Sequence, residues 1–221
     1  VSTRDNIRGS DKTLLSTLTM IEVDSNKTHP VDTSERIQVI GWIGDQLIYV
    51  KVNDEKKKNG VSTHSLISYD SKNDTKTEVS GNLFFNDVMV AGDRIYYAPS
   101  AEYEYPEDGG DTKTVNKDSL GLFSTNSTGG DKKTIISKEI WSISRKDYTT
   151  IVVGSGKDWY EFSMVNNAVS KLSGAPADQG TRIYVDSIDN KKSLWVDKRD
   201  GKGVLLAYSI GKQDDKTLSS M

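Results

Sequence analysis

The stretch Gly41-Trp42-Ile43-Gly44-Asp45-Gln46-Leu47-Ile48-Tyr49-Val50 joins two apolar runs through a short polar turn. The same pattern returns as Val90-Ala91-Gly92-Asp93-Arg94-Ile95-Tyr96-Tyr97-Ala98, and more loosely at 141–153 and 185–196. Each copy has an apolar run rich in β-branched and aromatic residues, a polar turn that contains an Asp, and a second apolar run. This is the pattern of a β-hairpin, and its repetition predicts a repeat-built, all-β protein.

A second, shorter pair of apolar runs follows each hairpin. It is found at 66–79, 122–136, 160–172 and 205–218. A similar N-terminal pair, 18–31, has no such hairpin before it. Corresponding positions are 46 residues apart from Asp24 to Asp70 and 56 apart from Asp70 to Asn126. The spacing then falls to about 40 residues, which is typical of four-stranded propeller blades.

We therefore predict a β-propeller of four-stranded antiparallel blades, with about 4.5 to 5 blades in a single domain over residues 1–221. The expected parts are a half or irregular blade and four full blades, at 1–35, 36–80, 81–137, 138–173 and 178–220. Blades that stack around an axis bury both faces of each sheet and leave only short edges. Two interpretations stay open, because residues 1–35 could supply a fifth blade or the chain could be a piece of a larger propeller.

The composition excludes several classes of function. The chain has 29 Lys and Arg interspersed with 32 Asp and Glu, and its net charge is −3. It therefore lacks the positive electrostatic potential that binding to nucleic acid requires. No apolar run approaches the roughly 18 residues of a membrane-spanning helix, so we expect no membrane span. The absence of Cys excludes disulfides, thiol nucleophiles and Cys-type zinc sites. The chain starts at Val1 without a charged-then-apolar leader, so we expect a piece from which the signal or anchor is missing.

The hairpin copies resemble a degenerate form of the Trp-Ser-x-Asp-Gly-x-x-Ile-x-Phe hairpin of TolB-type propellers, which prolyl-oligopeptidase relatives also carry in their propeller domains. Trp42, Asp45 and the run 47–49 match best, whereas Val90 replaces the Trp and the turn after Trp141 is longer. The resemblance covers most of residues 36–218. It implies a noncatalytic, extracytoplasmic bacterial protein, periplasmic or on the cell surface, that binds other proteins. In the peptidase relatives the catalytic triad lies in a separate α/β domain, and these 221 residues show no such domain.

A hydrolase triad is not indicated. His29 and His64 are the two histidines, and no Gly-x-Ser-x-Gly elbow surrounds any serine. We interpret both histidines as solvated or edge residues, since His is commonly found at such positions.

A glycosidase-type site at the propeller axis is the alternative. Such sites use two carboxylates as general acid and as base or nucleophile. The expected innermost strands carry three acids that could serve, namely Asp87, Glu139 and Asp186. The opposing interpretation is that these acids face solvent or cap turns.

An acidic insertion runs from Pro99 to Ser119 inside the second full blade. Its candidate binding residues are Glu102, Tyr103, Glu104, Tyr105, Glu107, Asp108 and Asp111. Carboxylates suit Ca²⁺ or a cationic partner, and Tyr faces stack on sugar rings. The ordered ligand spacing of an EF-type loop is missing, so we predict no defined metal site and no cofactor other than Ca²⁺. The plainer interpretation is an extended hairpin with a flexible, Gly-rich tip.

The sequence thus favours a noncatalytic extracytoplasmic interaction or scaffolding module whose loops contact another protein or a cell-wall polymer. A carbohydrate-binding or glycosidase-type axial site is the alternative. The four tryptophans, Trp42, Trp141, Trp159 and Trp195, are expected to pack between blades.

Overall fold

The computed structural model describes residues 2–3, 15–22, 24–58, 61–104, 113–114, 116–174, 183–188, 192–199, 202–209 and 216–220. The chain divides into two compact units, residues 1–139 and 140–221. The division falls between the second and third of four four-stranded sheets. The part of the chain that the structure describes has no helix long and apolar enough to cross a bilayer.

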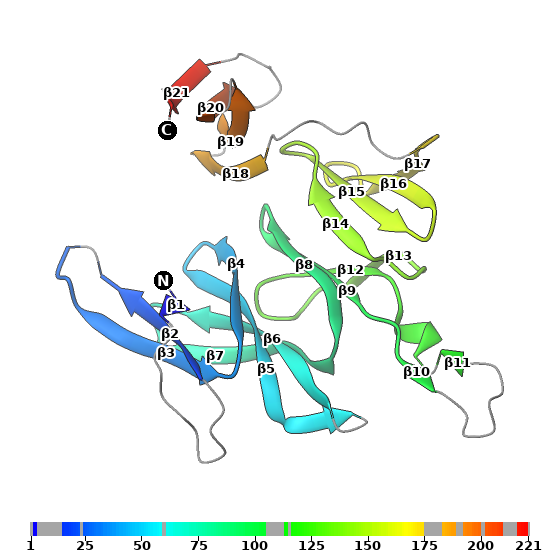
Figure 1. The fold of residues 1–221 in the computed structure, drawn as a ribbon, viewed down its shortest axis with the longest axis horizontal. Coiled ribbons are helices and arrows are strands. Elements are labelled where there is room, and N and C mark those ends of the chain that lie inside the picture. Colours follow the sequence, from blue (N-terminus) through cyan, green and yellow to red (C-terminus); the bar gives the residue numbers. More distant parts are fainter. Residues whose placement is uncertain are drawn as a thin grey trace. The chain divides into compact units, whose positions relative to one another are not determined.

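Strands follow one another in antiparallel sheets (Figure 1). In the first unit, one sheet consists of β4 (Ile37–Ile43), β5 (Gln46–Lys58), β6 (Val61–Asp70) and β7 (Thr75–Leu83). The next consists of β8 (Phe85–Ala91), β9 (Arg94–Pro99), β12 (Leu122–Thr125) and β13 (Lys133–Ile136). Between β9 and β12 lie β10 (Tyr103–Glu104), β11 (Lys113–Thr114) and the short 3₁₀ helix η1 (Lys117–Ser119). An N-terminal three-stranded sheet contains β1 (Ser2–Thr3), β2 (Ser16–Ile21) and β3 (Thr28–Ser34).

The second unit repeats the four-stranded pattern twice. Its first sheet contains β14 (Ser142–Arg145), β15 (Thr150–Ser155), β16 (Asp158–Ser163) and β17 (Ala168–Lys171). Its second contains β18 (Ile183–Ile188), β19 (Lys192–Arg199), β20 (Lys202–Ser209) and β21 (Lys216–Ser220). The predicted all-β fold with antiparallel four-stranded sheets is confirmed. The placement of all sheets in one domain stays a prediction.

The turns follow from the residues that the repeats share. Gly44 and Gly92 each begin a two-residue hairpin turn and have φ of +57° and +62°, which glycine adopts without steric penalty. At the end of the third strand of each of these two sheets, a side-chain oxygen caps the next turn. Asp70 Oδ1 accepts from Lys72 N at 2.9 Å, and Asn126 Oδ1 accepts from Gly130 N at 2.8 Å.

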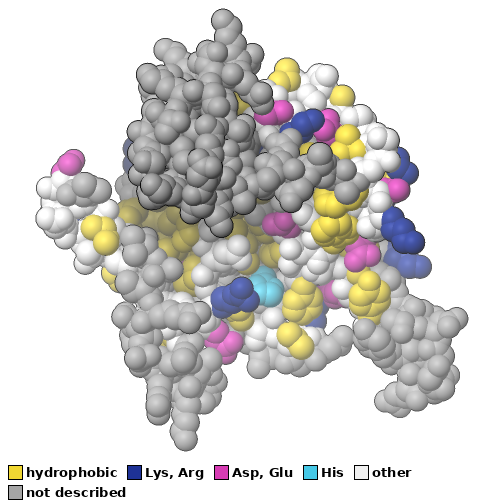
Figure 2. Space-filling view, turned by 45° about the horizontal axis from the view of Figure 1, so that its top comes forward, with side chains coloured by type: hydrophobic (Ala, Val, Ile, Leu, Met, Phe, Trp, Pro, Cys, Tyr) yellow, Lys and Arg dark blue, Asp and Glu magenta, His cyan; other side chains and the backbone are white. Residues whose placement is uncertain are grey.

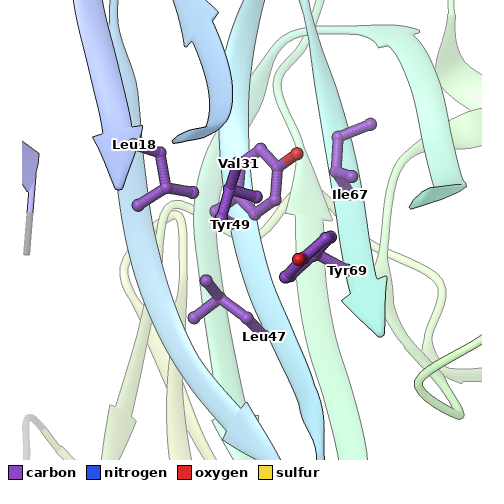
Figure 3. Packing of buried hydrophobic residues seen from close by; sticks show 6 residues of the cluster. All are labelled: Leu18, Val31, Leu47, Tyr49, Ile67 and Tyr69. Atoms are coloured by element: carbon purple, nitrogen blue, oxygen red, sulfur yellow. The ribbon is translucent and has the colours of Figure 1, made fainter. Parts of the chain in front are cut away.

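The second strand of each four-stranded sheet in the first unit is buried on both faces. Leu47 and Tyr49 of β5 pack with the N-terminal sheet, in a cluster with Leu18, Val31, Ile67 and Tyr69 (Figure 3). Ile48 and Val50, which point the other way, pack with β9 and β12 in a cluster with Leu66, Ile95, Tyr97 and Phe123. Since successive side chains alternate between the two faces, a continuous apolar run needs a neighbouring sheet on each side.

A polar network supports the contact between the N-terminal sheet and the β4–β7 sheet. Tyr49 Oη donates to Asp32 Oδ2 at 2.7 Å, and Lys51 Nζ lies 3.0 Å from the same oxygen. Burial raises the pKa of Asp32, but the hydrogen bonds from Tyr49 and Lys51 and the charge of Lys51 outweigh burial and hold it below its usual range. The Asp32 carboxylate is therefore ionised and bridges β3 to β5.

The expectation that the tryptophans pack between blades is wrong for Trp42 and Trp141, whose residues are 48% and 46% exposed. Trp42 lies on β4, and Trp141 directly precedes β14. Both strands are the first of their sheet, and the first strand is less buried than the second. Trp141 contacts Trp159 edge-on at 4.9 Å between ring centroids, and its Nε1 donates to the Gly156 carbonyl at 3.2 Å. The side chain of Trp195 lies outside the described part.

The two-faced core makes Ile48, which is fully buried, a sensitive position. We expect Ile48→Ala to lower the free energy of unfolding by about 2–5 kcal/mol, because it leaves a cavity between two sheets. Ile21→Ala, at a residue that is 46% exposed, is the control and should change it by less than about 1 kcal/mol. Urea denaturation measures both, and equal losses would contradict the assignment of Ile48 to the core.

The Asp32 bridge predicts a pH dependence of stability. Because the folded pKa of Asp32 is depressed, its contribution is present above the unfolded pKa of about 3.9 and is lost as the pH falls through the folded value. Asp32→Asn should therefore cost about 2 kcal/mol at pH 7 and progressively less toward about pH 2. Denaturation at several pH values tests this. Asp45→Asn, which breaks an exposed ion pair with Lys72, should cost under about 1 kcal/mol throughout.

Candidate functional site

A cavity of about 310 Å³ lies in the first unit, where the first strands β4 and β8 of neighbouring sheets come together. Its lining comes from Arg36 and from the strands β4, β5, β6 and β8. The lining residues are Arg36, Gln38, Ile40, Val50, His64, Phe85, Asn86, Asp87 and Val88. The volume is at the lower end of the range typical of small-molecule sites.

Backbone bulges shape the walls of this cavity. The pairing of β4 with β5 shifts at Ile40, and the pairing of β8 with β9 shifts at Asn86. A third shift, between β6 and β7, falls next to His64. A bulge places an extra residue in one strand and redirects its side chains, which explains how four consecutive residues, 85–88, can line one cavity.

The cavity has a polar mouth and an apolar floor. Arg36, Gln38 and Asn86 are exposed and therefore lie at the opening, whereas Val50 is buried. Figure 2 shows Lys and Arg side chains interspersed with Asp and Glu on one face of the molecule. This face therefore carries no broad field of one sign.

His64 is the residue that the sequence interpretation misjudged. Within the described residues, its Nδ1 is the one buried side-chain nitrogen or oxygen without a hydrogen-bond partner. The ring contacts Phe84 edge-on, with 6.0 Å between ring centroids. Burial and then the charge of Arg36 lower the pKa of His64, and a hydrogen bond to the Leu83 backbone offsets this in part. The ring is thus neutral at pH 7, and Nδ1 is left with an unmade hydrogen bond.

The insertion begins beside this cavity. Ser100 Oγ donates to Asn86 Oδ1 at 2.6 Å, and Ser100 N donates to the Phe84 carbonyl at 2.7 Å. Asn116 closes the base of the insertion, because it donates to the Ser100 carbonyl and accepts from Glu102 N, both at 2.9 Å. β10 and β11 pair antiparallel above this base. A cavity wall and the insertion are therefore joined by direct hydrogen bonds.

The predicted site residues fall in different environments. Asp87 lines the cavity and accepts a hydrogen bond from Val88 N at 2.9 Å. Glu139 is exposed, precedes β14 and does not line the cavity. Asp186 lies on β18, and its side chain is outside the described part.

Of the insertion residues, Glu102 is 2.8 Å from Lys58 Nζ, so it stabilises the base rather than facing a partner. Tyr103 is 43% exposed. Glu104 is described in its backbone only, and Tyr105, Glu107, Asp108 and Asp111 lie outside the described residues. The described side chains do not bring together three or more His, Asp or Glu as a metal site would need.

Sequence reasoning missed Arg36, Gln38 and His64. A signal was present, because Arg36 and Gln38 alternate with apolar residues ahead of Ile40 at the start of the expected innermost strand. Of the residues on those strands, the acids alone were predicted as site residues. Nothing in the sequence marked the position of His64 against β4 and β8.

No family model and no curated protein matches the sequence. Among solved structures, the tricorn protease is similar with a TM-score of 0.52 and 10% identity over 92% of this chain and 24% of that one. An oligogalacturonate lyase from Vibrio parahaemolyticus has a TM-score of 0.47, with 11% identity over 94% of this chain and 62% of its own. The acylaminoacyl peptidase of Pyrococcus horikoshii has a TM-score of 0.49, with 13% identity over 93% and 35%.

The tricorn protease, which has a propeller-type fold, is the match with a TM-score above 0.5, and its likeness places the four-stranded sheets of this chain in the β-propeller class. The chain spans between about a quarter and just under two thirds of the proteins that it resembles. At 10% identity the likeness to the tricorn protease establishes the fold and not an activity.

The electrostatics of the cavity predict a measurable coupling between Arg36 and His64. Arg36→Gln should raise the pKa of His64, because a nearby positive charge disfavours the imidazolium, while burial should keep the value below the usual range of histidine. An NMR titration of the ring protons measures this, with His64→Gln to assign the signal. Lys27→Gln removes an exposed charge elsewhere and is the control. An unchanged His64 pKa in Arg36→Gln would contradict the coupling.

Proposed function

We propose that this chain is a noncatalytic binding module that holds its partner where the cavity and the insertion meet. The hydrogen bond between Ser100 and Asn86 carries this proposal, because it joins the base of the insertion to the cavity wall. A rigid scaffold with an anchored loop beside a cavity is a frequent arrangement in binding proteins. The partner is another protein or a cell-wall polymer that contacts the insertion and places one group in the cavity.

Binding without hydrolysis is favoured by the number of carboxylates. A glycosidase needs two carboxyl groups about 5 to 10 Å apart. Among the described residues that line the cavity, Asp87 is the one carboxylic acid. The neutral His64 could accept a proton, but no described nucleophile is hydrogen-bonded to it.

An extracytoplasmic location is the second part of the proposal. It is supported by the resemblance of the hairpins around Trp42 and Asp45 to those of TolB-type propellers. We infer a periplasmic or cell-surface role on this basis, with the partner drawn from the same compartment.

A backbone NMR experiment tests the shared site. Any cell-wall oligosaccharide or stem peptide that binds is expected to shift the amide signals of Asn86, Ser100 and Asn116 together. We expect no cleavage product after prolonged incubation. Glu104→Ser with Glu107→Ser and Asp108→Ser should weaken the binding of any ligand that reaches the insertion and change the melting temperature little. A ligand whose shifts map away from these three residues would contradict the site, and a cleavage product would contradict the noncatalytic role.

A further inference from the structure

We infer that Asn26, in the turn between β2 and β3, is the acceptor for an N-linked glycan. The acceptor pattern for this modification is Asn-x-Ser/Thr, and the chain contains it at 26–28, 73–75 and 126–128. The pattern alone does not separate these three places, but the hydrogen bonds of the three asparagines do. The inference rests on the extracytoplasmic part of the proposed function, because this modification belongs to exported proteins.

Asn126 caps a turn. Its Oδ1 accepts hydrogen bonds from Gly130 N at 2.8 Å, from Thr128 Oγ1 at 3.0 Å and from Thr128 N at 3.1 Å. These bonds hold the connection between β12 and β13 in place. Both groups that a transferase must recognise, the carboxamide and the hydroxyl two residues later, are therefore engaged within the chain.

Asn73 is held in a similar way. Its Nδ2, the atom that would carry the sugar, donates to Asp70 Oδ2 at 2.9 Å, and its backbone N donates to Asp70 Oδ1 at 3.0 Å. The side-chain bond from Asn73 is the largest cause that lowers the pKa of Asp70, to about 2, so the acceptor is ionised at neutral pH. Transfer of a sugar to this nitrogen would first have to break a charge-assisted hydrogen bond.

Asn26 makes no such bonds. Its side chain is exposed and has no hydrogen-bond partner among the described residues, and the same is true of the Thr28 hydroxyl. Other groups hold the turn, because Ser25 Oγ donates to Glu22 Oε2 at 2.7 Å and accepts from Lys27 N at 3.3 Å. A transferase can therefore bind the carboxamide and the hydroxyl while the turn stays folded.

The backbone explains only part of this motif. Asn26 has a φ of +52°, in the left-handed region that Asn and Asp tolerate. Asp74 and Asn167 have φ of +51° and +54° in the turns that lead into β7 and β17. The conformation thus accounts for an Asn or Asp at position 26, but it does not require a hydroxyl at position 28.

An acidic side chain also precedes the Asn26 motif. Asp24 lies two residues before the acceptor, whereas Ser71 and Ser124 occupy this place in the other two motifs. All residues from 24 to 28 are exposed. The segment is therefore accessible along its length and offers a transferase a charged contact that the other two motifs lack.

The transfer joins the carboxamide to a sugar that is carried on a lipid pyrophosphate. A bond forms between Asn26 Nδ2 and C1 of the sugar, and the bond from C1 to the phosphate oxygen breaks. Nδ2 gives up one proton to a base of the transferase, and the lipid pyrophosphate leaves. This chain supplies the carboxamide, and the transferase and the lipid-linked sugar are the other reactants.

Mass spectrometry of the folded, full chain after incubation with a bacterial oligosaccharyltransferase and a lipid-pyrophosphate-linked oligosaccharide tests the inference. We expect Asn26 to be modified at least about tenfold more than Asn73 or Asn126, because a bonded carboxamide reaches the enzyme only when its turn opens. Asn26→Gln and Thr28→Ala should each abolish the main product. Asn73→Gln, which makes the same change at another exposed motif, is the control and should keep it.

Two results would overturn the inference. One is a folded chain that stays unmodified at Asn26 while the same enzyme modifies a standard acceptor peptide. The other is equal modification of all three asparagines. Neither result bears on the cavity, because residues 24–28 do not line it, and the mapping of Asn86, Ser100 and Asn116 tests that site independently. Fractionation of the source cells tests the extracytoplasmic location in turn, so the failure of each proposal is a separate observation.

Discussion

The burial of the second strands β5, β9 and β15 on both faces is the constraint on which the rest of the structure depends. Ile48 and Tyr49 are adjacent in the chain and both fully buried, yet they belong to different clusters on opposite sides of β5. A two-layer sandwich gives each sheet one buried face and one solvated face. A sheet whose middle strand is apolar on both faces needs a neighbour on each side, and stacked blades meet that need.

This constraint is visible in the sequence, which is why the fold could be predicted. The runs 47–50, 95–98 and 151–153 are continuously apolar, and in the structure they are the buried second strands. The turns could be predicted as well, since Gly44 and Gly92 adopt a positive φ at the positions where the hairpin turns require it. Strand periodicity did not separate first strands from second strands, so Trp42, on a first strand, was wrongly assigned to the core.

The candidate site was only partly predictable, because it depends on shifts in strand register. Asp87 could be selected as an acid on an expected inner strand. The cavity itself requires the bulges at Ile40 and Asn86, which redirect side chains by one position and leave no compositional mark in a single sequence. Long-range pairing also brings His64 of β6 to β4 and β8, and no local pattern records that placement.

The bulges also show that, within one repeat, different strands serve packing and carry the polar side chains. A register shift recurs on the first strands β4, β8 and β18, and the residues that follow it are Gly41, Asp87 and Asp186. At Gly41 a Cβ would lie at an ordinary van der Waals distance of 3.5 Å from the Val90 side chain, so this position packs between β4 and β8. At Asp87 the equivalent position carries a carboxylate into the cavity. First strands are not buried on both faces as the second strands are. Their residues can therefore differ between blades, and a binding site can form there without loss of the fold.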